Sequence, residues 1–345
     1  MTATVLRVSD LAVPFGDAPG LSGITFAVTA GERLVLLGAS GSGKTTLLRA
    51  IAGLSPIAAG EIEIGGTIAT HLAAELRDTV YLHQTPLLFP HLSVFENVAF
   101  PLRLRKTPED RVRAAVKRLL ASVRLEDFQG RRPFMLSGGQ RHRVALARAV
   151  AAGPKVLLLD EPLASLDPVL RDDVRTALLA LQAEFHPALV IVTHDLEDAA
   201  VLGDRIGLLV GSTLAQLDRP EQIFHHPASL QVARFLGIAN EIPGQIVDGC
   251  FRSTVGCIPV GAGLVAGPAV AVFGADALRL APDGPITGVF QSCRHGPERA
   301  TLSITVGDLQ LESTTTLICG PTRGDQVRLE LDPDRVTVFP GSADV

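Results

Sequence analysis

Short apolar runs follow one another along the first two thirds of the chain, and their spacing predicts strands. Residues 5–13 and 24–28 alternate between apolar and polar positions, and residues 33–37 form an apolar run that stops at Gly38. A period of two is typical of strands with one buried face. We expect a glycine-rich turn next, followed by a helix that begins at Lys44.

Four more apolar runs occur farther along the chain, and helical stretches separate them. These runs are residues 80–82, 156–159, 189–192 and 206–210. Continuous apolar strands that alternate with helices are typical of parallel sheets covered on both faces. The pattern therefore predicts an α/β core with a mostly parallel sheet.

A helical segment interrupts this core. No strand pattern occurs in residues 86–154, and Thr107 with Pro108 and two following acidic residues forms a helix start, with Thr107 as the cap. We expect a helical subdomain at about residues 86–154.

The last third of the chain has a different character. After a helix expected over residues 222–235, the sequence becomes rich in Gly, Pro, Val and Thr, with short alternating runs. The uncharged stretch at residues 253–275 is long enough to cross a bilayer, but its prolines and glycines favour short strands. We therefore expect one domain at residues 1–237 and a small barrel-like β domain at residues 238–345.

Composition and charge limit the classes of function. The chain has 345 residues, 47% of them apolar, which suffices for two folded domains. The net charge is -5, but residues 101–150 contain thirteen Lys or Arg against four Asp or Glu. A uniformly basic nucleic-acid-binding protein does not have this distribution, so no nucleic acid partner is expected. The basic segment suits either a solvated helix face or a docking face for an acidic or membrane-proximal partner.

The cysteines and the first ten residues indicate in which cellular compartment the protein is found. No cysteine lies in a C-x-x-C pair, which favours free thiols in a reducing cytosol over a metal site or a disulfide. Arg7 and Asp10 leave no apolar core for a signal peptide. We therefore expect a cytosolic protein. The last third of the chain contains all four cysteines, Cys250, Cys257, Cys293 and Cys319.

Residues 38–45 match the phosphate-binding pattern G-x-x-x-x-G-K-[ST], between an expected strand and an expected helix. Glycines allow successive backbone N–H groups to face phosphates, and Lys44 adds a positive charge. The hydroxyl of Thr45 is expected to bind Mg²⁺. The residues expected to hold the nucleotide phosphates are Gly38, Ala39, Ser40, Gly41, Ser42, Gly43, Lys44, Thr45 and Thr46.

Two acidic residues follow the apolar run at residues 156–159. Asp160 and Glu161 are thus expected at the edge of the sheet where ligands bind in such folds. Asp160 would hold Mg²⁺ through water, and Glu161 would polarise the attacking water as a general base. Paired acids at a strand end often form only a solvated turn, but a preceding phosphate loop favours catalysis. These motifs indicate a P-loop nucleotidase without narrowing the class.

A third motif, Leu-Ser-Gly-Gly-Gln at residues 136–140, precedes another helix. Ser137 and Gln140 fit the S-x-x-Q capping pattern, so a capped helix is one interpretation. Each glycine weakens a helix by about 1 kcal/mol relative to alanine, so stability alone does not account for two of them. The approach of a phosphate to this helix start would account for them.

With these motifs in order, the first two thirds of the chain resemble the ABC ATPase family. Residues 136–140 resemble the family signature, and residues 165–167, Ser-Leu-Asp, resemble the loop that crosses between subunits. The resemblance implies that Gln84 senses metal and water, that His194 contacts the γ-phosphate, and that Phe15 stacks on adenine. It implies ATP and Mg²⁺ as cofactors, Glu161, His194 and Gln84 as catalytic residues, and Thr45, Gln84 and Asp160 as metal ligands.

Cassettes of this family pair head to tail, so the resemblance also implies partners. A second copy of the chain would contact the bound ATP through Ser137, Gly138, Gly139, Gln140 and Asp167. Closure on ATP and opening after hydrolysis would drive two transmembrane permease subunits, whose coupling helices would bind near residues 84–100, with a solute-binding protein as an indirect partner. The chain would then lie peripherally on the cytoplasmic face of the cell membrane.

The segment after residue 238 resembles the TOBE-type barrel of importer ATPases for iron, polyamines, sugars and oxyanions. Among these cargoes, the resemblance favours iron(III) or a polyamine. Residues 273–277 depart from the Arg-Pro-Glu typical of that barrel, so ligand sensing and simple packing against a second copy both stay open.

The alternative function for the whole chain is that of a soluble ABC protein of DNA repair or translation, but the chain has neither a long coiled-coil insertion nor a second cassette. A small-molecule P-loop kinase would not explain residues 136–140, and exporter cassettes are commonly fused to membrane spans.

Overall fold

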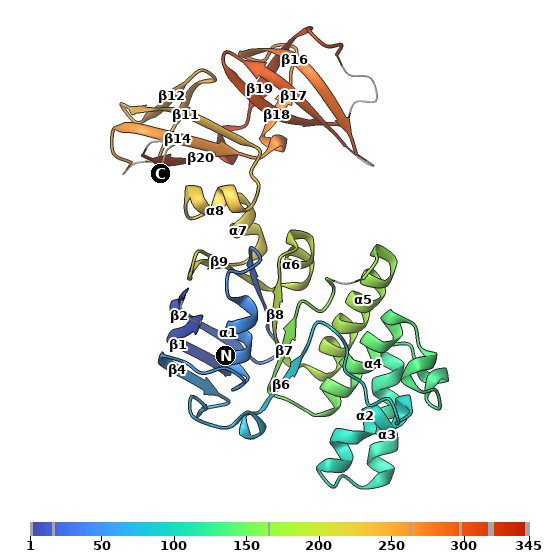
Figure 1. The fold of residues 1–345 in the computed structure, drawn as a ribbon. Helices are drawn as coiled ribbons and strands as arrows, with labels where there is room; N and C mark the ends of the chain where they lie inside the picture. The colour runs from blue at the N-terminus through green and yellow to red at the C-terminus, as the bar shows by residue number, and fades with distance from the viewer. Residues whose placement is uncertain are drawn as a thin grey trace. The chain divides into compact units, whose positions relative to one another are not determined.

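The computed structural model describes residues 3–15, 18–164, 166–261, 264–296, 299–316 and 321–341. The chain divides into two compact units, Met1–Ile223 and Phe224–Val345 (Figure 1). Each unit has its own sheets and its own core.

A six-stranded sheet forms the centre of the first unit, in the order β10-β9-β3-β8-β7-β6. The five strands from β9 to β6 are parallel, and β10 pairs antiparallel at the edge. Every residue of β7 and β8 is buried, as the continuous apolar runs predict. The strands are β3 (Arg33–Gly38), β6 (Thr79–Leu82), β7 (Val156–Asp160), β8 (Ala188–Thr193), β9 (Arg205–Val210) and β10 (Thr213–Asp218).

Helices cover both faces of this sheet, which confirms the predicted α/β core. Figure 1 shows α1 (Lys44–Ile51) on one side, and α5 (Pro168–Phe185) with α6 (Leu196–Leu202) on the other. Arg175 of α5 bonds the nearly buried carboxylate of Asp198 in α6 at 2.6 Å, which joins these two helices.

A separate antiparallel sheet, in the order β2-β1-β4-β5, packs on the same apolar core as α1. Alternate residues of β1 are buried, as its period of two predicts, except that the alternation shifts by one residue at an irregularity between Val8 and Leu11. The short strands β4, β5 and β10 were not predicted from the sequence. The strands of this sheet are β1 (Thr4–Phe15), β2 (Ala18–Thr29), β4 (Ala59–Ile64) and β5 (Thr67–Ile68).

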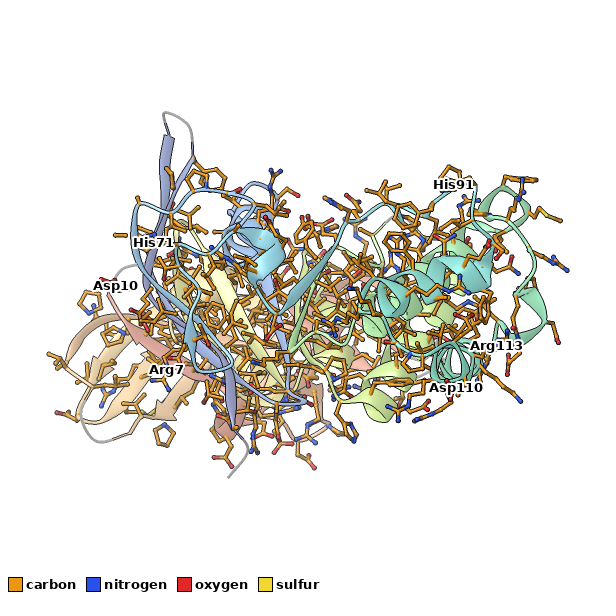
Figure 2. All side chains as sticks on the ribbon, turned by 90° about the horizontal axis from the view of Figure 1, so that it is seen from below. Arg7, Asp10, His71, His91, Asp110 and Arg113 are labelled. Atoms are coloured by element: carbon orange, nitrogen blue, oxygen red, sulfur yellow. A yellow bond between two sulfur atoms is a disulfide. The ribbon has the colours of Figure 1, made fainter. Side chains whose placement is uncertain are left out.

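A helical segment without strands lies between β6 and β7, as predicted. Figure 2 shows Asp110 and Arg113 of this segment at the opposite end of the first unit from Arg7 and His71. Pro108, not Thr107, precedes the first turn of α3, and no side chain caps it. The helices are α2 (Val94–Leu104), α3 (Glu109–Ser122) and α4 (Gly138–Ala151), with 3-10 turns η1 (Ala74–Leu76), η2 (Glu126–Phe128) and η3 (Pro133–Met135) nearby in the chain.

Several arginines of the basic segment have structural roles. Arg141 donates to the backbone oxygen of Leu136 at 2.7 Å, and Arg143 donates to the oxygen of Val123 at 2.8 Å. Arg148 donates to the oxygen of Leu87, and burial lowers its pKa. These guanidinium groups tie helices to loops, which the charge count alone could not reveal.

The prediction of a single helix over residues 222–235 is wrong. The structure has two short helices, α7 (Pro220–His225) and α8 (Leu230–Phe235). Pro227 lies between them, and proline both lacks an N–H donor and disfavours helical backbone in the preceding residue. Ser229 then caps α8 by accepting from the N–H of Val232.

Besides α8, the second unit consists of two five-stranded antiparallel sheets, which confirms the predicted small all-β part. One has the order β13-β12-β11-β14-β20 and the other β15-β19-β16-β17-β18. The end strands β15 and β18 contact each other, so the second sheet nearly closes, and the buried hydroxyl of Ser313 donates to the oxygen of Leu278 at 2.6 Å across this contact. The uncharged stretch at residues 253–275 contributes to β12, β13 and β14.

The elements of the second unit are short, as the turn-rich sequence predicts. In the described residues, no helix has the length and apolar character that a bilayer crossing requires. The elements are β11 (Asn240–Val247), β12 (Cys250–Ser253), β13 (Gly256–Pro259), β14 (Gly267–Phe273), η4 (Ala275–Ala277), β15 (Leu278–Leu280), β16 (Ile286–His295), β17 (Ala300–Val306), β18 (Leu309–Thr315), β19 (Gln326–Leu331), η5 (Pro333–Arg335) and β20 (Thr337–Pro340).

The expectation of free cysteines is wrong for two of the four. Cys250 and Cys257 form a disulfide, with Cα atoms 5.9 Å apart. They lie on the paired strands β12 and β13, and this hairpin register brings them together although their sequence spacing does not suggest it. Cys293 is a free, half-buried cysteine, and Cys319 lies outside the described residues.

Candidate functional site

The glycine-rich loop lies between β3 and α1, where the sequence predicted it. Gly43 precedes the first turn of α1 with a φ of 94°, a conformation that side chains rarely adopt. A Cβ atom at Gly43 would lie 2.9 Å from the ring of Phe15. The expected adenine-stacking residue therefore lies against the phosphate loop, although it belongs to a different sheet.

Lys44 is held inside this loop. Its ammonium group donates to the backbone oxygens of Gly38 at 2.8 Å and Ala39 at 2.9 Å. Burial lowers the pKa of Lys44, while the carboxylates of Glu161 and Asp160 act in the opposite direction. The loop and the two acids expected from the sequence thus form one electrostatic site.

The carboxylate of Asp160 accepts two hydrogen bonds. One oxygen accepts from the Thr45 hydroxyl at 2.8 Å and the other from the Tyr81 hydroxyl at 2.6 Å, and the residue is only 8% exposed. A hydroxyl next to a carboxylate offers the hard oxygen ligands that Mg²⁺ takes, with water and phosphate oxygens completing its shell. The donor set therefore fits the metal.

Glu161 and His194 lie together beside this pair. Oε1 of Glu161 is 3.1 Å from Nδ1 of His194. Glu161 has a φ of 44°, in the left-handed region, and its N–H donates to the oxygen of Val192 on the neighbouring strand at 3.0 Å. This backbone directs the chain out of β7 immediately after Asp160.

The segment at residues 136–140 forms a capped helix start, as its S-x-x-Q pattern predicts. The Ser137 hydroxyl accepts from the N–H of Gln140 at 3.3 Å, and the Gln140 side chain accepts from the N–H of Ser137 at 2.9 Å. A Cβ atom at Gly138 would meet open space, whereas one at Gly139 would lie 3.0 Å from Leu170 of α5. Gly139 therefore packs closely against α5, in addition to the phosphate role expected from the sequence.

The loop at residues 165–167 leads into α5. Asp167 caps this helix by accepting from the N–H of Leu170 at 3.1 Å. Ser165 lies outside the described residues.

Comparisons with known proteins agree with this set of motifs. The model of the ABC transporter family matches residues 21–164. The sulfate/thiosulfate import ATP-binding protein of Xanthomonas campestris pv. campestris is 40% identical over 94% of this chain and 96% of its own length. The spermidine/putrescine import ATP-binding protein of Marinobacter nauticus is 41% identical over 84% of this chain and 74% of its own length.

The chain belongs to the ABC transporter family. The resemblance inferred from the motifs, to ATP-binding subunits of the importer type, is thereby confirmed, as are nucleotide binding and the ATPase class.

Sequence reasoning missed two residues of this ABC ATPase. Tyr81, the only tyrosine in the chain, was counted as part of an apolar strand, yet it bonds Asp160 as described above. His142 is 8% exposed, and its two ring nitrogens lie 3.1 Å from the backbone oxygens of Gln84 and Gly138. His142 therefore links the segment after β6 to the start of α4. The unusual residue types were the only signal in the sequence.

Replacing Tyr81 with phenylalanine tests whether its hydroxyl positions Asp160. Burial and the bond to Asp160 raise the pKa of Tyr81, so the hydroxyl stays protonated and donates. Without it, one oxygen of Asp160 loses its partner, and we expect the Mg²⁺ concentration for half-maximal ATP hydrolysis to rise ~10-fold. ATP binding measured without Mg²⁺ should not change. The control Thr79→Val removes a hydroxyl from the same strand, and an equal shift in this control would contradict the prediction.

Proposed function

We propose that this chain is the ATP-hydrolysing, energy-coupling subunit of an ABC importer. The observation that carries the proposal is the similarity to an import ATP-binding protein over 94% of this chain, which includes the second unit as well as the first. We propose an ATPase domain at residues 1–237, with a helical subdomain at about 86–154, and a TOBE-like β domain at residues 238–345. The two compact units divide somewhat earlier, before α8.

We propose the following roles for the site residues. The loop residues 38–46 bind the phosphates, and Phe15 stacks on the adenine. Glu161 accepts the proton of the attacking water. His194, whose ring lies beside Glu161, contacts the γ-phosphate. Thr45, Asp160 and Gln84 would hold Mg²⁺, which, when bound, neutralises the charge that develops on the phosphates. A second copy would supply Ser137, Gly138, Gly139, Gln140 and Asp167.

Exposed apolar side chains beside these motifs support pairing of two chains. Phe134 and Met135, directly before the 136–140 segment, are 76% and 54% exposed, and Val169, just after Asp167, is 75% exposed. Apolar surface of this kind often marks a site of association. We propose that it is covered when two copies close on ATP.

A groove in the helical subdomain supports the proposed permease contact. This cavity of about 310 Å³ is lined by His91, Leu92, Glu96, Phe100, Arg103 and Leu104. Leu104 is 73% exposed and Leu87 is 59% exposed. An apolar groove with a polar rim suits the apolar face of a helix. We propose that coupling helices of two permease subunits bind near residues 84–100, which places the chain peripherally on the cytoplasmic face of the membrane, with a solute-binding protein as an indirect partner.

The names of the relatives divide between sulfate or thiosulfate and polyamines, and we propose no single cargo. The importer proposal is tested by producing the chain with the permease subunits encoded beside its gene and assembling them in proteoliposomes. ATP hydrolysis should rise when the solute-loaded binding protein is added. Failure of the chain to assemble with any such permease, while it hydrolyses ATP alone, would contradict the importer role.

Replacing Ser137 with arginine tests the shared site. The bulky cation would block the approach of a phosphate bound to the other chain, so hydrolysis should fall ~10²-fold. Each monomer should still bind ATP with unchanged affinity. Ser93→Arg is the matched control, because Ser93 caps α2 in the same way, with Glu96 as its partner. Unchanged hydrolysis in Ser137→Arg would argue against a site shared between chains.

A further inference from the structure

The disulfide of the second unit lies in a hairpin at the edge of a sheet, where β13 is the outermost strand and pairs with β12. Successive side chains of a strand point to opposite faces. Phe251 and Ile258 are buried in the core, so Cys250 and Cys257 lie on the opposite face. Cys257 is exposed there, whereas Cys250 is only 9% exposed. A reagent in solution therefore reaches Cys257 more readily than Cys250.

A positive charge lies beside the exposed cysteine. Arg252 of β12 is directly opposite Cys257 in the strand register, and directly opposite residues share a face with their Cβ atoms about 5 Å apart. On its other side, Arg252 is opposite Gln245 of β11, which carries no charge. Arg252 makes no ion pair within the described part of the chain. Its guanidinium group is therefore free to attract an anion that approaches Cys257.

The only other charge in this part of the sequence lies near the other cysteine. Within residues 247–261, Asp248 and Arg252 are the only charged residues. Asp248 is exposed in the turn that leads into β12, two positions before Cys250. Residues 262 and 263, which lie outside the described part, are alanine and glycine. An anionic reagent is thus attracted toward Cys257 and repelled near Cys250.

We propose that Cys257 is a site of reversible modification by a small anionic thiol, meaning a low-molecular-weight thiol that carries at least one carboxylate. The thiolate of this compound attacks Sγ of Cys257, and the bond from Cys257 to Cys250 breaks. The Cys250 sulfur leaves as a thiolate and takes up a proton. The products are a mixed disulfide at Cys257 and a thiol at Cys250. A second molecule of the compound then attacks the mixed disulfide, which leaves both cysteines reduced and joins the two small thiols in a disulfide.

The hairpin favours this exchange at both sulfurs. Arg252 attracts the carboxylate of the compound, and it stabilises a thiolate at Cys257 once that residue is reduced. Sγ of Cys250 lies 3.8 Å from the backbone oxygen of Phe251, which can accept the S–H of the released thiol. The exchange removes the cross-link between β12 and the edge strand β13. This inference goes beyond the proposed transport function and does not depend on it.

The test treats the full chain with two thiols that differ in charge, the anionic mercaptopropionate and the neutral mercaptoethanol. Free thiols are then blocked with iodoacetamide, and chymotryptic cleavage after Phe251 separates the two cysteines for mass spectrometry. Before treatment, we expect the peptides of Cys250 and Cys257 to be joined by their disulfide. Early in the treatment, the thiol adduct should occur at Cys257 and the iodoacetamide label at Cys250.

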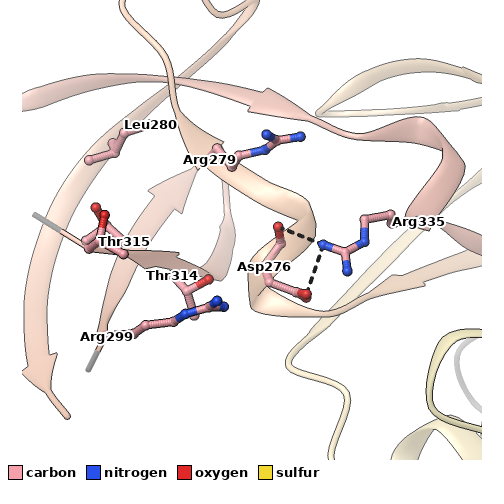
Figure 3. Close-up of a pocket in the computed structure, with 8 residues that line it drawn as sticks. Asp276, Arg279, Leu280, Arg299, Thr314, Thr315 and Arg335 are labelled. Atoms are coloured by element: carbon pink, nitrogen blue, oxygen red, sulfur yellow. Dashed lines mark hydrogen bonds and ion pairs between the residues drawn. The ribbon is translucent and has the colours of Figure 1, made fainter. Parts of the chain in front are cut away.

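Replacing Arg252 with glutamine tests the role of its charge. The rate constant for mercaptopropionate is divided by that for mercaptoethanol, so that general effects on the disulfide cancel. At low salt this ratio should fall ~3-fold in Arg252→Gln. Arg279→Gln is the matched control and should leave the ratio unchanged. Arg279 is an exposed arginine on β15 in the other sheet, where it lines a cavity together with Arg335 and Asp276 (Figure 3).

Variants with a single cysteine in the hairpin test which sulfur reacts. With the oxidised form of mercaptopropionate, Cys250→Ser should form the mixed disulfide at Cys257 ~10-fold faster than Cys257→Ser forms it at Cys250. Equal rates in these two variants would overturn the proposal, as would iodoacetamide labelling of both cysteines in the untreated chain. An equal fall of the ratio in Arg252→Gln and Arg279→Gln would also overturn it. None of these measurements involves ATP or a permease, so their outcome is independent of the transport proposal.

Discussion

Glutamine in place of Glu161 should reduce ATP hydrolysis by ~10³-fold while ATP still binds. Glu161 directly follows Asp160, its Oε1 lies 3.1 Å from Nδ1 of His194, and it influences the pKa of Lys44, so its carboxylate lies inside the proposed nucleotide site. The amide has nearly the same shape but cannot accept a proton from water. With hydrolysis blocked, the ATP-bound chains should accumulate as a dimer, and light scattering coupled to size-exclusion chromatography measures this directly.

A carboxylate elsewhere on the same unit provides the control for this variant. Glu75, exposed on η1, can be replaced with glutamine without touching the site. Rapid hydrolysis by Glu161→Gln would remove Glu161 from the role of general base. A chain that stays monomeric with ATP and Mg²⁺ in this variant, both in solution and with its permease, would contradict the shared site.

Alanine in place of Lys44 should weaken ATP binding by ~10²- to 10³-fold, because the buried cation proposed to bind the phosphates is lost. The ammonium group already lies within the loop, where it bonds Gly38 and Ala39. Equilibrium binding of a fluorescent ATP analogue measures the effect. Lys117→Ala removes an exposed lysine from α3 and should leave binding unchanged. Equal affinities in the two variants would exclude Lys44 as a phosphate ligand.

The core of the first unit could be predicted because its strands are continuous apolar runs with few alternatives. The strands β4 and β10 were missed because their patterns are short: in β4 only residues 61–64 alternate between Glu and Ile, and β10 is a short strand at the edge of its sheet. The prediction of one helix over residues 222–235 was wrong because the apolar pattern continues through Pro227, whereas the helical backbone cannot.

The chemistry-bearing motifs could be located because each needs its residues close together in the sequence. The contacts of Tyr81 and His142 are instead made between residues far apart in the chain, so no spacing rule could predict them. The same holds for Gly139, whose neighbour Leu170 comes from another helix. The disulfide between Cys250 and Cys257 likewise depended on strand register.

At position 161 the backbone conformation favours glycine, whereas the proposed chemistry requires a carboxylate. A left-handed backbone suits glycine, whereas glutamate stores strain there, of order 1 kcal/mol or more. Glycine would therefore relax the turn after β7, yet it would leave no carboxylate beside His194. With Glu161 in its proposed role as general base, this turn gives up some folding stability for catalysis. We therefore expect Glu161→Gly to raise the melting temperature of the protein and to abolish ATP hydrolysis.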